Sequence, residues 1–209
     1  MGVKERKIRE KEKRRREILK TAEKLFSGKK GFEATMDDLA EKSELGKGTL
    51  YLYFPNKERI LLALTEKAIR VLKKRLSHAL DETVTGIEQL SDNGDAFVKF
   101  LYEKPFYASL IIKFEKKILT DAASGERVLL VEPILNLLQK ILIKGQEDKT
   151  LRSDIGTKEL VTILWSQMLG ILNTLSGRQE IMEIYGVDRE WIIKGHYRVI
   201  MSGLAASDK

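Results

Sequence analysis

Apolar residues recur at intervals of three and four along most of the 209-residue chain, a spacing that places them on one face of an α-helix. The alternation of apolar and polar residues that marks a half-buried strand is absent from the sequence. Each of the three prolines falls near an expected helix boundary or kink. The pattern therefore predicts an all-α protein of about nine helices.

Several helices have bounds that the pattern defines. They span Lys4–Ser27, Lys47–Phe54, Lys57–Leu80, Val128–Ile143, Lys158–Leu175 and Arg189–Leu204. Residues 83–146 should hold three helices, with a break at Pro105, a polar loop from Asp121 to Gly125, and Pro133 starting or kinking the last of them. Because Lys57–Leu80 is too long for a small domain, we expect it to be a rigid connection between two. The expected domains are residues 1–56 and 57–209.

The segment from Thr35 to Lys57 predicts two short helices joined by a tight turn. Thr35 and Asp38 form a capping-box pattern at the start of the first, and Asn56 is placed to cap the long helix that follows. The second short helix has too little apolar surface to serve packing alone. Small residues at its start permit close approach of a partner, and a cation and two phenols suit phosphates and base edges. These residues are Gly46, Lys47, Gly48, Thr49, Tyr51 and Tyr53. The segment is typical of a helix-turn-helix that binds double-stranded DNA.

The charge is concentrated near this motif. Residues 1–60 contain 17 Lys and Arg against 11 Asp and Glu, whereas the remaining 149 residues contain 21 against 20. Such an asymmetry favours a nucleic-acid-facing module on a neutral body, although a solvated basic helix without a partner would give the same count. Before Ile18 the first helix has no apolar stripe, and it is either a frayed helix or a basic arm along DNA. Three Glu–Arg pairs at a spacing of four residues would support it weakly: Glu5/Arg9, Glu10/Arg14 and Glu12/Arg16.

The motif extends beyond a general pattern. The relevant residues are Thr35, Leu39, Ala40, Leu45, Lys47, Gly48, Thr49, Leu50, Tyr51, Tyr53, Phe54, Lys57 and Glu58, preceded by Ile18, Ala22, Leu25, Phe26, Gly31 and Phe32. In this order they closely resemble the DNA-binding signature of the TetR family of bacterial transcriptional repressors. One position departs from the family pattern, because Glu44 stands at the turn where glycine is usual. Since glycine adopts positive φ at little cost, Glu44 implies mild strain or a different turn.

The resemblance implies a three-helix DNA-binding domain followed by a helical ligand-binding and dimerisation domain. It implies that DNA is contacted by Thr35, Gly46, Lys47, Gly48, Thr49, Tyr51, Tyr53 and Lys57. Thr35 could instead be only a helix cap, and Tyr51 could mainly fill the small core. Two-fold symmetry would then call for a palindromic operator with half-sites about one helical turn apart, or a multiple of that spacing.

The last two long helices are expected to form a homodimer. The helix Lys158–Leu175 is apolar on most of its surface, and one small chain can cover only part of it. TetR proteins dimerise through their C-terminal helices as a four-helix bundle, so the resemblance points the same way. The alternative is that both helices pack wholly within the monomer. The expected interface residues are Leu160, Leu164, Ile171, Trp191, Tyr197 and Ile200.

The family usually holds a small effector among helices that correspond to residues 57–175, and its binding moves the DNA-reading heads. Residues that could line such a pocket are Phe100, Tyr102, Phe106, Tyr107, Phe114, Asn136, Trp165, Met168 and Asn173, although each of them taken singly is more often ordinary core. Their mostly apolar character would favour a hydrophobic or aromatic effector.

Other functional classes find little support in the sequence. Without cysteine there are no disulfides or thiolate sites, and the two histidines, His78 and His196, lie in no metal-binding motif. Gly46-Lys47-Gly48 lacks the strand and the earlier glycine of a phosphate-binding loop. We expect no catalytic or metal-binding residues and no cofactor. With neither a membrane-spanning run nor a signal peptide, the expected location is the cytoplasm, without membrane contact.

The expected function is therefore a dimeric, ligand-released repressor and not an enzyme. One alternative is a TetR-like DNA-binding protein without a small effector. The other is an all-helical scaffold or enzyme whose basic N-terminus meets RNA or a membrane.

Overall fold

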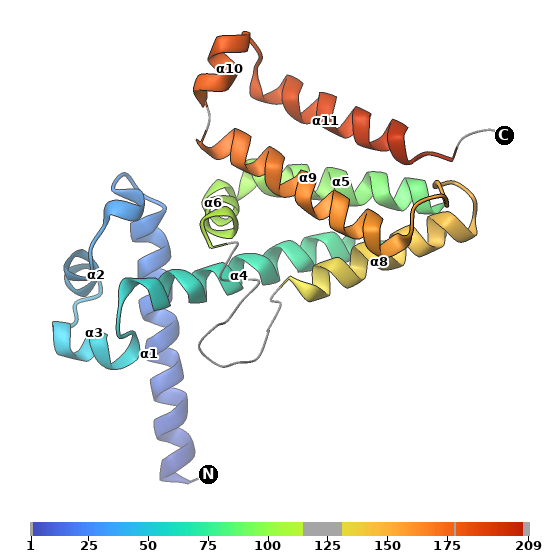
Figure 1. The fold of residues 1–209 in the computed structure, drawn as a ribbon. Helices are drawn as coiled ribbons and strands as arrows, with labels where there is room; N and C mark the ends of the chain where they lie inside the picture. Colours follow the sequence, from blue (N-terminus) through green and yellow to red (C-terminus); the bar gives the residue numbers. More distant parts are fainter. Residues whose placement is uncertain (1, 115–130, 178, 207–209) are drawn as a thin grey trace. The chain divides into compact units, whose positions relative to one another are not determined.

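The structure is a computed structural model, and it describes residues 2–114, 131–177 and 179–206. Within these ranges it is all-helical apart from one isolated β-bridge, which confirms the predicted fold class (Figure 1). The expected loop from Asp121 to Gly125 and the start of the expected helix at Val128 lie outside the described residues.

The helices follow one another with short connections. Their bounds are α1 (Val3–Phe26), α2 (Met36–Lys42), α3 (Lys47–Tyr53), α4 (Lys57–His78), α5 (Gly86–Glu103), α6 (Pro105–Lys113), α8 (Glu132–Glu147), α9 (Thr157–Gly177), α10 (Gln179–Tyr185) and α11 (Arg189–Leu204), with a 3-10 turn, η1 (Gly31–Glu33), after α1. The expected break at Pro105 is confirmed, and Pro133 lies in the first turn of α8. The pattern missed α10, a seven-residue helix that ends in Ile184 and Tyr185, both 77% exposed, and therefore has no inward apolar stripe there.

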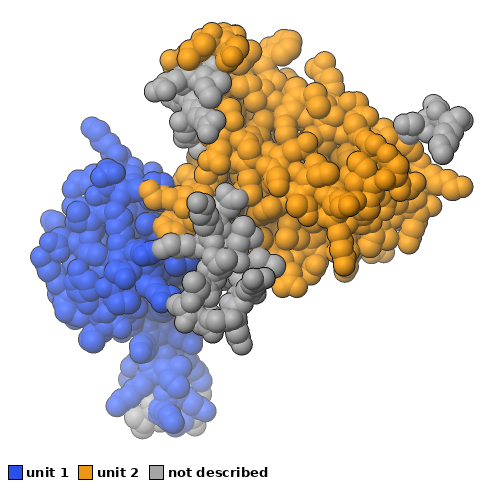
Figure 2. All heavy atoms as spheres, in the orientation of Figure 1, with its two compact units in different colours: residues 1–67 blue, residues 68–209 orange. Residues whose placement is uncertain are grey.

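The contacts divide the chain into two compact units, residues 1–67 and 68–209 (Figure 2). The division falls within α4 and not at its start at Lys57, because the first turns of α4 belong to the core of the first unit. Ile60 and Leu64 are fully buried there, and Lys67 forms an ion pair of 2.6 Å with Glu23 of α1.

In the first unit, α1, α2, α3 and the start of α4 enclose a small core. Ile18, Leu39, Leu50 and Phe54 are each at most 2% exposed. Glu44 has a φ of 53°, so this non-glycine residue adopts the left-handed conformation in the turn between α2 and α3. The turn therefore keeps the usual geometry at the cost of local strain.

Two predicted helix caps are confirmed. The Thr35 hydroxyl accepts the Asp38 N–H at 3.1 Å, and the Asp38 carboxylate accepts the Thr35 N–H at 2.7 Å, which completes the capping box of α2. Asn56 accepts the Arg59 N–H at 2.9 Å at the start of α4. Each cap satisfies a backbone N–H that has no partner inside its helix.

The capping box should make the stability of the protein pH-dependent. A hydrogen bond from Lys30, with further bonds from Thr35, lowers the pKa of Asp38 from 3.8 to about 2. Because the folded-state pKa is the lower one, the ionised carboxylate stabilises the fold above about pH 4, and this contribution is lost as the pH falls towards 2. We expect Asp38→Ala to lower the melting temperature at neutral pH and to approach the wild type near pH 2, as measured by circular dichroism. The control is Asp37→Ala, whose carboxylate makes no capping bond; an equal, pH-independent loss in both variants would contradict the assignment.

The ion pairs along the start of α1 differ from the expected set. The structure pairs Arg6 with Glu10 at 2.9 Å and Arg14 with Glu17 at 3.5 Å, and none of the three expected Glu–Arg pairs forms. All four of these side chains are at least half exposed, so the exchange of partners has little energetic weight.

In the second unit, α5 packs against α8, α8 against α9, and α11 against α5 and α9 (Figure 1). The helices α5 and α8 meet at two glycines, because a Cβ on Gly86 would lie 2.2 Å from the backbone of Gly145. The Gly86 N–H also donates to Asp148 at 2.7 Å. Only glycine permits this close approach.

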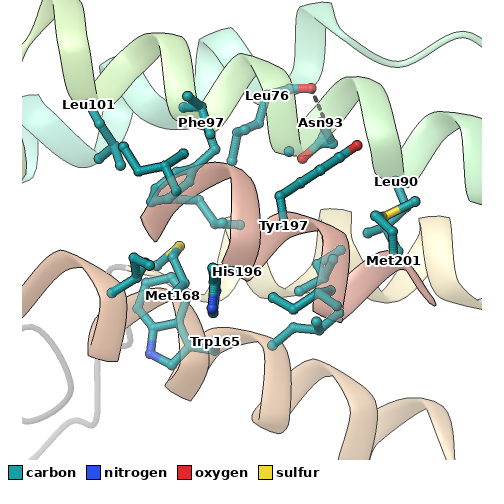
Figure 3. A pocket seen from close by; sticks show the side chains of 18 residues that line it. Leu76, Leu90, Asn93, Phe97, Leu101, Trp165, Met168, His196, Tyr197 and Met201 are labelled. Carbon is teal, nitrogen blue, oxygen red and sulfur yellow. Dashed lines mark hydrogen bonds between the residues drawn. The ribbon is translucent and has the colours of Figure 1, made fainter. Parts of the chain in front are cut away.

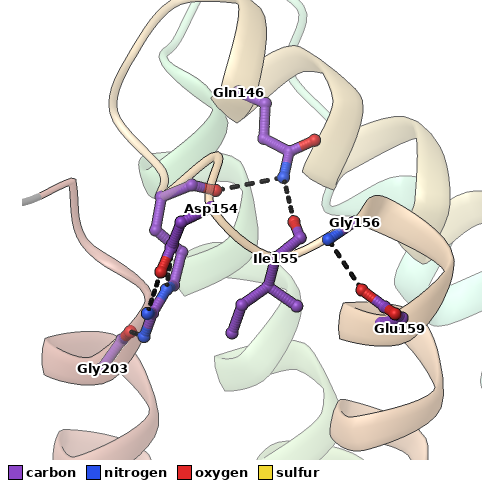
Figure 4. Close-up of polar contacts among 7 residues, drawn as sticks. Gln146, Asp154, Ile155, Gly156, Glu159 and Gly203 are labelled. Carbon is purple, nitrogen blue, oxygen red and sulfur yellow. Dashed lines mark hydrogen bonds and ion pairs between the residues drawn. The ribbon is translucent and has the colours of Figure 1, made fainter.

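The loop between α8 and α9 holds the end of α11. Leu151 and Ala205 form the isolated bridge, and the Arg152 N–H donates to the Leu204 carbonyl at 2.9 Å. The Arg152 guanidinium binds Asp154 and donates to the Gly203 carbonyl at 3.0 Å (Figure 4). Gln146 closes the loop from the other side by donating to two of its carbonyls. The C-terminal end of α11 is therefore fixed to the body of the second unit.

Candidate DNA-binding surface and ligand cavity

The short helix α3 has one buried and one exposed face. Leu50 and Phe54, four residues apart, are buried in the core of the first unit. On the other side Gly48, Tyr51 and Leu52 are exposed, at the three- and four-residue spacing of one helix face. This is the arrangement in which a helix can enter a major groove, because none of the described residues of the unit covers its outward side.

Most of the predicted DNA-binding residues lie in or next to α3 and are exposed, whereas Thr35 and Lys57 form hydrogen bonds within the unit. Gly46, Lys47, Gly48 and Thr49 are all exposed, and Tyr51 is 46% exposed, so the alternative of Tyr51 as a core residue does not hold. Tyr53 is half-buried.

Thr35 and Lys57 have structural roles. The Thr35 hydroxyl donates a hydrogen bond to the Asp38 carboxylate at 2.9 Å and accepts one from the Asp38 N–H at 3.1 Å. The Lys57 ammonium donates to the Phe32 carbonyl and lies 5.7 Å from the centre of the Phe26 ring. If either side chain contacted a DNA phosphate, that contact would have to compete with these hydrogen bonds or be added to them.

Lys47 also has a protein partner. Its ammonium lies 2.7 Å from an oxygen of Asp37 in α2, a bond that raises the pKa of the lysine. Both side chains are more than 60% exposed, so the pair contributes little to stability. The bond holds the Lys47 ammonium at the start of α3.

Leu52 is the residue of this surface that sequence reasoning missed. Its side chain is 81% exposed, on the face that carries Gly48 and Tyr51. An exposed leucine on such a helix can contact the methyl group of a thymine. Its helical spacing from Gly48 was visible in the sequence, but an apolar side chain is more readily assigned to a core.

The second unit contains an apolar cavity of about 150 Å³ among α4, α5, α8, α9 and α11 (Figure 3). Its walls are mainly leucine, isoleucine, methionine and aromatic side chains. At this volume a dry apolar cavity can hold a benzene-sized group, although ligand pockets are usually larger, about 300–1,000 Å³.

Few polar groups reach the cavity. The Asn93 amide donates to the Leu76 carbonyl at 2.9 Å, and the Tyr197 hydroxyl donates to Ser91 at 2.6 Å, so both are satisfied. Burial lowers the pKa of His196, which favours the neutral imidazole. The Trp165 indole N–H is buried without a hydrogen-bond partner among the described residues. The site therefore suits an uncharged, mostly apolar molecule.

Two of the nine residues expected to line a pocket, Trp165 and Met168, line this cavity. The others lie elsewhere. Phe100, Tyr107 and Phe114 are buried, Phe106 is half-buried, and Tyr102, Asn136 and Asn173 are exposed. Sequence reasoning missed the α5 side of the cavity, including Leu90, Phe97 and Leu101, although these residues have the spacing of one helix face.

The six residues expected at a dimer interface lie in three different environments: the interior, the cavity wall and the surface. Leu160 is 1% exposed and lies in the interior of the unit, while Leu164, Ile171, Tyr197 and Ile200 line the cavity. Among them only Trp191 presents a large exposed surface, at 71%. It lies on a stripe of α11 that also carries Val199, equally exposed, and Ile163 on α9 is 43% exposed.

The described ranges contain neither a candidate membrane span nor a candidate metal site. None of the helices described there is long and apolar enough to cross a membrane. Nor do the described His, Asp and Glu side chains form a group of three that could hold a metal ion.

Comparison with known proteins gives matches in sequence and in fold. Residues 18–64 match the family described as bacterial regulatory proteins, tetR family. The uncharacterized HTH-type transcriptional regulator YfiR of Bacillus subtilis is 31% identical over 150 residues, covering 65% of this chain and 69% of that protein. The HTH-type transcriptional regulator EthR of Mycolicibacterium smegmatis is 40% identical over 67 residues, 32% of this chain and only 29% of that relative.

Solved structures share the fold over nearly the whole chain. A tetR-family regulatory protein from Rhodococcus RHA1 has a TM-score of 0.69 at 14% identity and covers 94% of this chain and 99% of its own. FadR of Thermus thermophilus, a repressor solved in complex with lauroyl-CoA, has a TM-score of 0.64 at 18% identity, over 93% and 97% of the two chains. With its extended match to YfiR and its helix-turn-helix matching the family description, the chain belongs to the TetR family of bacterial regulatory proteins.

Proposed function

We propose that this protein is a homodimeric, cytoplasmic transcriptional repressor without catalytic activity, which binds a palindromic operator and is released by an uncharged apolar ligand. The observation that carries the proposal is the uncovered face of α3, on which Gly48, Tyr51 and Leu52 join the Lys47 ammonium. A surface leucine and two exposed small residues have no packing purpose there, but they suit close approach to base edges and thymine methyls.

Lys47→Ala should weaken operator binding about tenfold while leaving the dimer and the melting temperature unchanged, because the exposed ammonium makes only a weak bond to Asp37. The measurement is a gel-shift titration on DNA from around the protein's own gene, with random duplex as competitor. Lys42→Ala is the control, since Lys42 is an exposed lysine at the far end of α2. Equal affinity of the wild type for both duplexes at moderate salt would refute sequence-specific binding.

The cavity supports the ligand part of the proposal. It is lined mainly by apolar side chains, by His196, whose pKa is lowered by burial, and by Trp165, whose indole N–H has no hydrogen-bond partner among the described residues; these two groups could fix the orientation of a ligand carbonyl or hydroxyl. The Thermus thermophilus structure holds lauroyl-CoA, and only the apolar acyl chain of that ligand resembles the class that this lining suits.

The helix α4 supports coupling between ligand and DNA. It begins at Lys57, in the unit that carries α3, and its residue Leu76 lines the cavity. The Leu76 carbonyl also accepts the buried bond from Asn93. A ligand that displaces Leu76 would act on the same helix whose first turns pack in the DNA-binding core.

Medium-chain fatty-acid esters and small aromatic alcohols should raise the melting temperature if they bind the native cavity, because a ligand specific to the native state stabilises it. Leu164→Phe, which fills the cavity, should abolish the shift, whereas the exposed α8 control Ile143→Phe should retain it. The same ligand should release operator DNA from the wild type. Absence of any shift in a broad screen would favour the alternative of a TetR-like DNA-binding protein without a small effector.

A further inference from the structure

The first turns of α1 extend beyond the core of the first unit as an exposed helix. Every described side chain from Lys4 to Glu17 is exposed, and burial begins at Ile18. We call residues 4–16 the basic arm. It carries nine Lys and Arg against three Glu, whereas residues 17–67, which include the whole helix-turn-helix, carry nine Lys and Arg against nine Asp and Glu. The positive charge of the DNA-binding unit therefore resides in its arm.

The arm has a distinct cationic face. Lys7, Lys11 and Arg14 follow one another at intervals of four and three residues, and the same spacing leads on to the buried Ile18 and Ala22. The face that packs on the core further along α1 is thus continued by three cations. In the described part of the chain, Lys7 and Lys11 form no ion pair, so their charges are available to a partner.

This cationic face lies next to the end of α3. A surface groove is lined by Tyr53, the last residue of α3, and by six side chains of α1 with four cations against two carboxylates: Lys7, Lys11, Lys13, Arg14, Glu10 and Glu17. The Arg15 guanidinium lies 4.8 Å from the centre of the ring of Phe54, the residue that follows α3, and this contact fixes the end of the arm against the core of the unit. DNA that is read by α3 would therefore run past the groove.

The composition of the arm favours nucleic acid over a membrane. Ile8 is its only large apolar residue, so the arm lacks the apolar face that inserts an amphipathic helix into a bilayer. At a rise of about 1.5 Å per residue, the arm is roughly 20 Å long. Duplex DNA presents a phosphate charge about every 1.7 Å of its axis, so an arm of this length can follow several phosphates.

We propose that the basic arm binds the phosphate backbone of duplex DNA flanking the half-site read by α3, with Lys7, Lys11 and Arg14 facing the phosphates. The inference rests on the proposed DNA binding of α3. It assigns to the arm most of the salt-dependent affinity, and to the electrically neutral helix-turn-helix most of the sequence discrimination.

The test compares two double variants of the full-length protein with the same loss of charge. Lys7→Gln/Lys11→Gln alters the groove face, whereas Arg9→Gln/Arg16→Gln alters exposed cations outside the groove. Affinity for operator and for random duplex is measured against salt concentration. The groove variant should lower the slope of log K against log salt by about 2 per protomer and weaken binding to both duplexes at least about tenfold near 0.1 M salt. The control variant should stay within about threefold of the wild type.

The specificity ratio separates this inference from the proposed function. The ratio of operator to random affinity should be nearly unchanged in the groove variant, because phosphate contacts carry no sequence information. Equal salt slopes for the two double variants would overturn the arm assignment while leaving operator recognition intact. A wild type without operator preference would refute the proposed function itself. Tighter binding to single-stranded RNA, or to vesicles with a quarter anionic lipid, would overturn duplex DNA as the partner.

Discussion

Replacing both Trp191 and Val199 by aspartate should yield a folded monomer that binds operator DNA at least about 100-fold more weakly than the wild type. Both side chains are 71% exposed on α11. Large apolar residues that are this exposed on one helix face usually mark an interface. A second copy of the chain would cover them, and two carboxylates in that interface would be buried without partners. Loss of the proposed dimer would remove the simultaneous engagement of two half-sites.

The monomer is detected by analytical ultracentrifugation, and its fold by circular dichroism. Ile143→Asp is the control, because Ile143 is an exposed residue of α8, 39% accessible, outside the α9–α11 surface. It should leave the protein dimeric and its operator affinity unchanged. A dimer that survives both aspartates would place the interface elsewhere and remove the support that Trp191 gives to the proposed dimer.

Gly86→Ala should destabilise the second unit by about 3 kcal/mol, at the upper end of the usual cost of overpacking. The added Cβ would lie 2.2 Å from both the Cα and the N of Gly145. Because these are backbone atoms, no change of side-chain rotamer relieves the clash, and α5 and α8 must separate. The separation would also stretch the 2.7 Å bond from the Gly86 N–H to Asp148.

Chemical denaturation measures the loss, and Gly203→Ala is the matched control. Gly203 lies in the last turn of α11, and a Cβ there would meet nothing within 4 Å. Because alanine favours a helix over glycine by up to about 1 kcal/mol, the control should be neutral or slightly stabilised. A Gly86→Ala protein as stable as the control would show that the α5–α8 contact is looser than described.

The helix-turn-helix could be predicted from the sequence because its signals are local. The capping box of Thr35 and Asp38, the cap at Asn56 and the turn at Glu44 each depend on residues within a few positions of one another. Local periodicity likewise located the last helix, whose observed bounds, Arg189–Leu204, match the expected ones.

The cavity could not be predicted in the same way, because it depends on how separate helices face one another. Tyr197 and Ile200 have the apolar character of interface residues, and the sequence does not tell an inward face of α11 from an outward one. Phe100 in α5 and Phe114, which follows α6, were expected to line the pocket because they are aromatic. Both are buried, but neither lines the cavity. The role of Lys57 was obscured for a similar reason, since its partner Phe32 is 25 residues earlier in the chain.

The attachment of α11 at one end has a mechanical consequence for the cavity. The Leu151–Ala205 bridge and the Arg152 bonds fix the helix at its C-terminal end, while its first residue, Arg189, makes a ring contact with the exposed Tyr102, 5.5 Å from the ring centre. Because Tyr197 in the middle of α11 is also held, through its hydrogen bond to Ser91, we expect only the turns before Tyr197 to swing outward, with the largest displacement near Trp191. A ligand larger than the present 150 Å³ would enter at that edge, and the same swing would move the surface proposed to hold the dimer together.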